Sequence, residues 1–88
     1  MNDSTQTIEL VDEADLDALA NPIRLKLLGM LRAEGPSTAT KLAGRIGESS
    51  GSTSYHLRVL EKRGFINEDA DRGNRRDRWW KASSQFTH

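Results

Sequence analysis

The chain contains no cysteine. A disulfide framework, a thiolate metal site and a cysteine nucleophile are therefore excluded, and the fold must depend on apolar packing. It also lacks an apolar run long enough to span a bilayer, and its polar start, residues 1–7, has neither the basic residues nor the apolar stretch of a signal peptide. We expect a cytoplasmic protein that makes no contact with a membrane.

The chain has few of the features that an enzyme requires. Its 88 residues allow one domain with a thin core and leave little room for a cofactor-binding unit. The two histidines, His56 and His88, have no nucleophile or metal-ligand set beside them in the sequence, and no phosphate-binding loop motif occurs. We therefore predict a protein that is not an enzyme and needs no cofactor and no metal.

Basic residues are absent from the first 20 positions, which hold six acidic residues. Residues 21–88 hold all 13 Lys and Arg residues against seven acidic ones, a net charge of +6 that the overall balance of zero conceals. The alternative interpretation is an acidic solvated tail beside an ordinary mixed surface. The position of the basic residues along the chain decides whether the domain has a basic surface or an ordinary mixed one.

Local signals predict two helices in the first part of the chain. A short amphipathic helix is expected over residues 11–19, with Leu16 and Leu19 on one face. Asn21 followed by Pro22 is a strong start signal for a second helix, which Gly35 ends. That helix is apolar on more than one side, so its second face must be covered by the first helix, by a partner subunit, or by both.

A helix-turn-helix pattern follows. Thr38 is a fitting N-cap for a third helix, and Gly47 suits the left-handed residue that closes it. Ser49 can cap a fourth helix over residues 50–63. At 100° per residue, one side of this helix gathers its apolar residues and the opposite side its polar ones. The expected inward residues are Thr53, Leu57, Leu60 and Gly64, and the expected outward residues are Gly51, Tyr55, Arg58 and Lys62.

Residues 65–69 and 77–82 read as two strands around a turn rich in Gly, Asn and Arg. By period 2 the packed face holds Ile66, Trp80 and Ala82, although a shift of one residue would exchange the roles of Trp79 and Trp80. The predicted fold class is α+β, mainly helical: a winged helix-turn-helix of about four helices plus a C-terminal β-hairpin wing. The predicted domain covers residues 11–82, between a disordered tail, 1–10, and a C-terminal tail, 83–88.

The fourth helix and the wing carry the candidate DNA-binding residues. Short hydroxyl groups and Arg58 on the helix can reach base edges in a major groove, and arginines at a hairpin tip can approach phosphates or a minor groove. The alternatives are a serine-rich capping loop and a hairpin tip that serves solubility. The wing patch consists of Arg72, Arg75, Arg76, Arg78 and Lys81.

Some candidates have a structural alternative, which for His56 and for the tryptophans is the favoured interpretation. Thr38 and Lys41 can offer phosphate contacts at a helix N-terminus or serve capping alone, and His56 can satisfy a local hydrogen bond or contact DNA. Packing is the alternative to base stacking for the tryptophans. The predicted DNA-binding residues are Thr38, Lys41, Ser50, Gly51, Ser52, Ser54, Tyr55, His56, Arg58, Arg72, Asn74, Arg75 and Arg76.

Three segments together resemble the winged helix-turn-helix repressors of the ArsR type: ANPIRLKLL at 20–28, KLA at 41–43 and SYHLRVLEKRGFI at 54–66. The resemblance covers about residues 15–82. It implies that the fourth helix enters the major groove and that the turn at 72–76 lies along the backbone or minor groove.

The sequence departs from this family in two places. Metal-sensing members carry cysteines where this chain has Thr38, Ala39 and Thr40, so a soft-metal sensor is not supported. Members also usually continue into a C-terminal helix that pairs subunits, so the chain is expected to be a fragment of a longer regulator or a minimal one. A minimal regulator would form a homodimer through Leu16, Leu19, Leu25 and Leu28.

The sequence therefore predicts a transcriptional regulator that binds double-stranded DNA sequence-specifically. The alternative is a winged-helix module that holds a protein partner and does not bind DNA.

Overall fold

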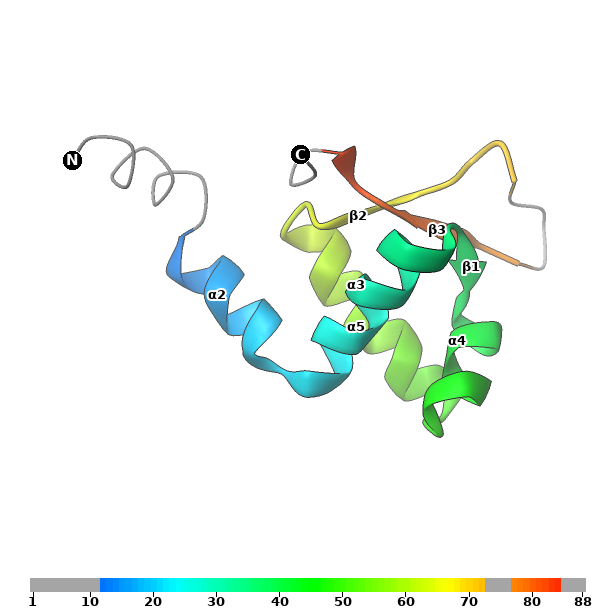
Figure 1. Cartoon of the computed structure of the whole chain (residues 1–88), viewed down its shortest axis with the longest axis horizontal. Coiled ribbons are helices and arrows are strands. Elements are labelled where there is room, and N and C mark those ends of the chain that lie inside the picture. Colours follow the sequence, from blue (N-terminus) through cyan, green and yellow to red (C-terminus); the bar gives the residue numbers. More distant parts are fainter. Residues whose placement is uncertain (1–11, 73–76, 85–88) are drawn as a thin grey trace.

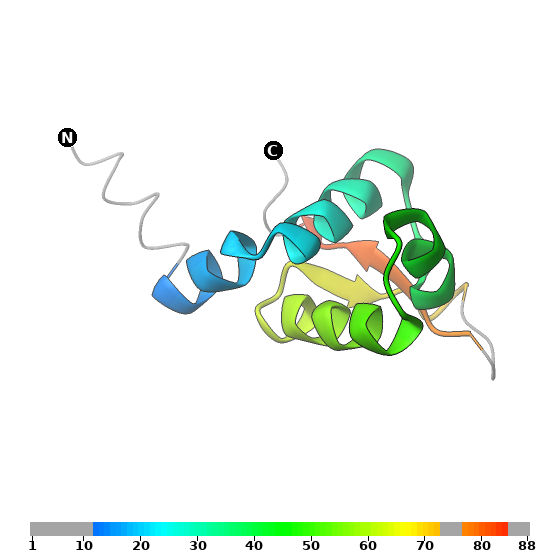
Figure 2. The same ribbon diagram turned by 90° about the horizontal axis from the view of Figure 1, so that it is seen from below.

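The structure is a computed structural model that describes residues 12–72 and 77–84. Figures 1 and 2 show α2 at one end of the molecule and the arms of the wing at the other. The elements in chain order are α2 (Glu13–Ala20), α3 (Pro22–Glu34), β1 (Ser37–Thr38), α4 (Ala39–Ile46), α5 (Ser50–Lys62), β2 (Ile66–Glu68) and β3 (Trp79–Ala82). The predicted fold class, mainly helical α+β with a winged helix-turn-helix, is confirmed.

Side-chain caps start the first two helices. Asp12 caps α2: the Asp15 amide donates to Asp12 Oδ1 at 2.9 Å, and the Asp12 amide donates to Asp15 Oδ2 at 3.2 Å. This capping box sets the first helical residue at Glu13, two residues later than predicted. Asn21 Oδ1 accepts from the Ile23 amide at 2.9 Å, with Pro22 at the first helical position as predicted.

The helix-turn-helix of α4 and α5 also follows its local signals. Thr38 Oγ1 accepts from the Lys41 amide at 3.2 Å, and Ser49 Oγ accepts from the Ser52 amide at 3.0 Å. Gly47 closes α4 with a φ of 74°, a conformation that favours glycine because it has no Cβ. The turn is therefore specified by its own residues.

A single core lies between the helices and the sheet. Leu27 and Leu31 from α3 meet Leu57 and Leu60 from α5, and the strands add Ile66. Each of these side chains is at most 2% exposed. The side of α5 predicted to be apolar is the one that packs, and one of the apolar sides of α3 packs against it.

The wing is a β2–β3 hairpin with a register that pairs Ile66 with Ala82 and Glu68 with Trp80. Trp80 is 4% exposed and Trp79 is half-buried, so Trp80 is the packed residue, as the preferred register predicted. The Ser83 amide donates to the Phe65 carbonyl at 2.9 Å, which continues the hairpin one residue beyond the predicted end of the domain at position 82.

A third strand was not predicted. Residues 37–38 form β1, which pairs with β3 so that the strand order is β1-β3-β2. Thr38 adopts an extended backbone, φ −110° and ψ 161°, and thus serves both as the N-cap of α4 and as a strand residue opposite Trp79. A two-residue strand shows no alternation in the sequence, because its partner on β3 defines it.

The second apolar side of α3 is buried at one position and exposed at another. Leu28 is 7% exposed and belongs to the core, whereas Leu25 is 54% exposed. On α2, Leu16 is 60% exposed and Leu19 packs partly against the core. Leu28 is therefore removed from the predicted dimer surface, since the protomer itself already buries it.

No helix within residues 12–72 and 77–84 has both the length and the apolar character to cross a membrane.

Candidate nucleic-acid interface

α5 places apolar and polar side chains on opposite sides. Thr53, Leu57 and Leu60 have no exposed surface, and Thr53 Oγ1 donates to the Ser49 carbonyl at 2.9 Å. On the other side Tyr55 is 59% exposed, and Arg58 is exposed as well. The division predicted from the helical period is confirmed, so this helix presents a polar face to solvent.

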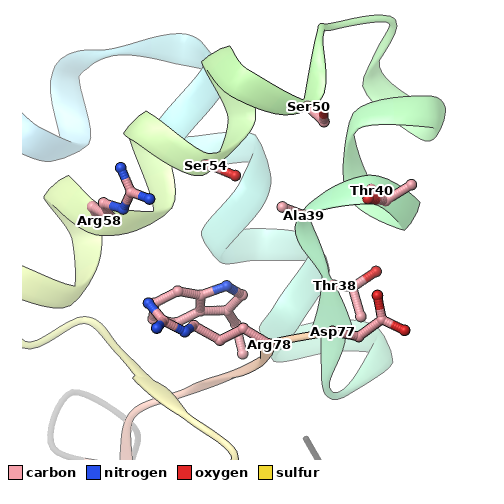
Figure 3. Close-up of a pocket in the computed structure, with 9 residues that line it drawn as sticks. Thr38, Ala39, Thr40, Ser50, Ser54, Arg58, Asp77 and Arg78 are labelled. Carbon is pink, nitrogen blue, oxygen red and sulfur yellow. The ribbon is translucent and has the colours of Figure 1, made fainter. Parts of the chain in front are cut away.

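The polar face of α5 borders an open cleft of about 300 Å³, the α5–wing cleft (Figure 3). Three elements meet there although they are far apart in the chain. The lining residues are Thr38, Ala39 and Thr40 at the start of α4, Ser50, Ser54 and Arg58 of α5, and Asp77, Arg78 and Trp80 of the wing.

Two arginines reach this cleft from different elements: Figure 3 shows Arg58 on α5 and Arg78 on the segment that leads into β3. Arg78 Nε lies 3.6 Å from Glu68 Oε2, and its Cζ lies 5.8 Å from the ring centroid of Trp80. The Arg78 side chain is still 57% exposed, so this ion pair contributes at most about 1 kcal/mol. Both guanidinium groups can therefore bind an anion at this site, and Asp77 limits how positive the cleft is.

Trp79, the residue before Trp80 on β3, has two more cations near its ring. Lys41 Nζ lies 4.6 Å and Arg72 Cζ lies 5.4 Å from the Trp79 ring centroid. Arg72 Nε also lies 3.4 Å from Asp69 Oδ2. Lys41 and Arg72, both predicted DNA-binding residues, thus lie around one aromatic side chain.

The hydroxyl groups at the helix starts have internal partners. Thr38 is 6% exposed and caps α4, which favours the capping alternative for its side chain. Ser52 Oγ donates to Glu48 Oε1 at 3.2 Å. Ser50 and Ser54, by contrast, line the α5–wing cleft.

His56, which was predicted among the DNA-binding residues, does not lie on the polar face of α5. Its side chain is 9% exposed, and Nδ1 lies 3.1 Å from Arg24 Nη1. Since an arginine can only donate, Nδ1 must accept, and the ring proton of the neutral imidazole is on Nε2. Burial, and then the charge of Arg24, lower the pKa of His56, while Glu48 opposes them. The local hydrogen bond is therefore the alternative that the structure supports.

The remaining predicted residues fall into two groups. Gly51 is exposed near the N-terminus of α5. Asn74, Arg75 and Arg76 lie outside the described residues. Five residues that line the α5–wing cleft are not among the predicted DNA-binding residues: Ala39, Asp77, Arg78, Trp80 and Thr40. Arg78 was named only as part of the wing patch. Thr40 is exposed and lies two positions after the N-cap, in the first turn of α4. That position was the only signal for it.

Within residues 12–72 and 77–84, no cluster of three or more His, Asp or Glu side chains could hold a metal ion.

The chain resembles known proteins in sequence and in structure. A family model described as a helix-turn-helix domain matches residues 19–69, more than half of the chain. No curated protein matches the sequence.

Several solved structures share the fold. A possible transcriptional regulator for arsenical resistance is 31% identical, with a TM-score of 0.71, and the match covers 85% of this chain and 73% of that one. An ArsR family transcriptional regulator is 29% identical, with a TM-score of 0.69 and coverage of 82% and 70%. The homodimeric winged helix-turn-helix DNA-binding domain of a possible ArsR-family regulator from Mycobacterium bovis is 25% identical, with a TM-score of 0.66 and coverage of 76% and 58%.

Proposed function

This chain belongs to the ArsR-type family of winged helix-turn-helix transcriptional regulators, which bind DNA and are not enzymes, and on that premise we propose that it reads double-stranded DNA sequence-specifically. In this proposal the polar face of α5 enters the major groove. The wing arginines lie on the backbone or in the minor groove. In this proposal the DNA-binding unit consists of the predicted residues 11–82 together with Ser83, which is bonded to the hairpin.

The observation that supports this arrangement is the α5–wing cleft. It brings Ser50, Ser54 and Arg58 of the proposed reading helix together with Arg78 of the wing. Hydroxyl groups and a guanidinium can hydrogen-bond base edges, and a second guanidinium beside them can neutralise a phosphate. Recognition and anchoring would then occur on one face of the domain.

The direct test is a salt titration of binding to a random duplex, followed by selection of a preferred sequence. The described residues of the proposed interface include four cations: Arg58 and Arg78 at the cleft, and Lys41 and Arg72 at Trp79. Each phosphate neutralised adds about −0.9 to the slope of log affinity against log salt. These four cations predict a slope of about −3 to −4 per protomer, and contacts from Arg75 and Arg76 would make it steeper. Absence of salt-dependent binding to any duplex at low ionic strength would refute the proposal and favour the protein-binding alternative.

Arg58 provides the test of base reading. Arg58→Ala should weaken binding to the selected sequence by about 10-fold to 100-fold, as expected for the loss of a base contact, and should reduce binding to random duplex less. Arg32→Ala is the matched control, because Arg32 is also exposed but lines a different cleft. Equal losses on both duplexes would assign Arg58 to a phosphate instead of a base.

We also propose that two copies pair through the exposed apolar side chains Leu16 and Leu25, with Leu19 at the edge of the contact. The relative from Mycobacterium bovis is described as homodimeric, which supports pairing here. Light scattering should show that Leu16→Asp or Leu25→Asp shifts a dimer to monomers. Tyr55→Ser should leave the dimer intact, although Tyr55 is as exposed as Leu16 and Leu25, because it lies on the proposed DNA face. A wild-type monomer at high concentration, or a dimer that survives Leu16→Asp and Leu25→Asp, would contradict the pairing.

A further inference from the structure

Trp79 has a fixed position between the first turn of α4 and the wing. It is the first residue of β3 and lies opposite Thr38 of β1 in the sheet. Its carbonyl accepts from the Asp69 amide at 2.7 Å, on the arm that follows β2. The indole is half-buried, so part of it remains accessible to solvent, while the Trp79 backbone is held by its pairing with β1 and by the bond from the Asp69 amide.

Two cations from different parts of the chain lie over this one ring. Lys41 Nζ of α4 is 4.6 Å from the ring centroid, and Arg72 Cζ of the wing is 5.4 Å from it. Both distances are within the roughly 6 Å at which a cation is attracted to an indole, the most favourable aromatic ring for this contact. The attraction orders two long side chains that would otherwise sample many rotamers.

The geometry also limits how far apart the two charges are. Since each distance is measured from the same centroid, Lys41 Nζ and Arg72 Cζ can be separated by no more than 10.0 Å. Asp69 is 8% exposed and holds Arg72 through Nε, yet the Arg72 side chain remains 55% exposed. A guanidinium held by its Nε edge still has donors on its two terminal nitrogens. The pair is thus arranged to meet an anion from solvent.

We propose that Trp79 is a positioning residue for DNA binding: its indole holds Lys41 and Arg72 together as one contact for the phosphates of a duplex backbone. This inference rests on the proposed function. Thr38 connects the two regions, because it both lines the α5–wing cleft and pairs with Trp79. One aromatic ring therefore sets the distance from the start of α4 to the wing and fixes the register of the backbone contact relative to α5.

The test compares Trp79→Leu, which keeps apolar bulk but removes the aromatic face, with Trp79→Phe, which keeps a face. Binding to random duplex is measured by fluorescence anisotropy over a range of salt concentrations. Trp79→Leu should reduce the magnitude of the salt slope by about 1 to 2, as expected when one or two phosphate contacts are lost, and Trp79→Phe should restore most of it. A Trp79→Leu protein with weaker binding but an unchanged slope would show a merely structural role and overturn the proposal.

A second measurement replaces the two cations, first with Trp79 intact and then in the Trp79→Leu background. Lys41→Gln and Arg72→Gln should each reduce the slope magnitude by about 1 in the wild-type background. In the Trp79→Leu background Lys41→Gln should cause little further loss, because Lys41 is no longer held in place. Equal effects of Lys41→Gln in both backgrounds would refute positioning by the ring. Wild-type protein without any salt-dependent binding would instead refute the proposed function itself, so the two failures are distinguishable.

Discussion

Arg24 connects the first described helix to the proposed reading helix, and its replacement is the most informative test of how this fold is held together. Arg24 Nε donates to the Ala18 carbonyl at the end of α2 at 2.8 Å. Nη1 lies 3.1 Å from His56 Nδ1 on α5. One half-buried side chain of α3 therefore links three helices. Arg24→Met removes both hydrogen bonds and puts an apolar side chain of similar length in the same place.

The expected loss follows from these contacts. A hydrogen bond from a charged donor contributes about 1.5–3 kcal/mol, and an orphaned buried acceptor costs about 1–3 kcal/mol. Because Arg24 is only partly buried, we expect Arg24→Met to lower the free energy of unfolding by about 2–4 kcal/mol. A domain of this size has roughly 4–13 kcal/mol in total, and each kcal/mol shifts Tm by about 4–8 °C. The melting temperature should fall by at least about 8 °C.

Urea unfolding followed by circular dichroism measures the effect. The matched control is Arg32→Met on the same helix, where the side chain is exposed and the change should stay within about 0.5 kcal/mol. A double-mutant cycle with His56→Gln should give a coupling energy of about 0.5–3 kcal/mol for Arg24 and His56. Equal losses for Arg24→Met and Arg32→Met, or a coupling energy near zero, would refute this account of the contact.

Three further outcomes are expected. Leu60→Ala leaves a cavity at a fully buried position, so it should lower the free energy of unfolding, measured in urea, by about 2–5 kcal/mol. Gly47→Ala places a side chain at a φ of 74° and should lower the unfolding free energy by about 1–2 kcal/mol, whereas Gly44→Ala within α4, with nothing within 4 Å of the added Cβ, should raise it by about 0.5–1 kcal/mol. Burial lowers the pKa of His56 below its ordinary 6.5, so the unfolded chain binds more protons and stability should fall as the pH drops through and below 6.5. In the His56→Gln protein the free energy of unfolding should change less between pH 7.5 and 5.5. A pH profile unchanged from the wild type would contradict this role of His56.

The sequence determined the elements that depend on neighbouring residues. Asn21 with Pro22, Thr38, Gly47 and Ser49 mark helix ends through hydrogen bonds that span two to four positions, so they could be recognised without a fold. The apolar period likewise divided α5 into its buried and exposed sides, since the helix fixes side-chain direction by itself. The exposed surface of Arg58, on which the proposed function depends, follows from that division.

Only the tertiary structure decided contacts between distant positions. β1 exists because residues 37–38 meet β3, and Leu28 is buried because of what packs on α3. His56 and Arg24, or Lys41 and Arg72 around Trp79, are brought together by helices and strands that the sequence predicts individually but does not orient. Local hydrogen bonds and periodicity act over a few residues, whereas the meeting of two faces depends on how the whole core closes.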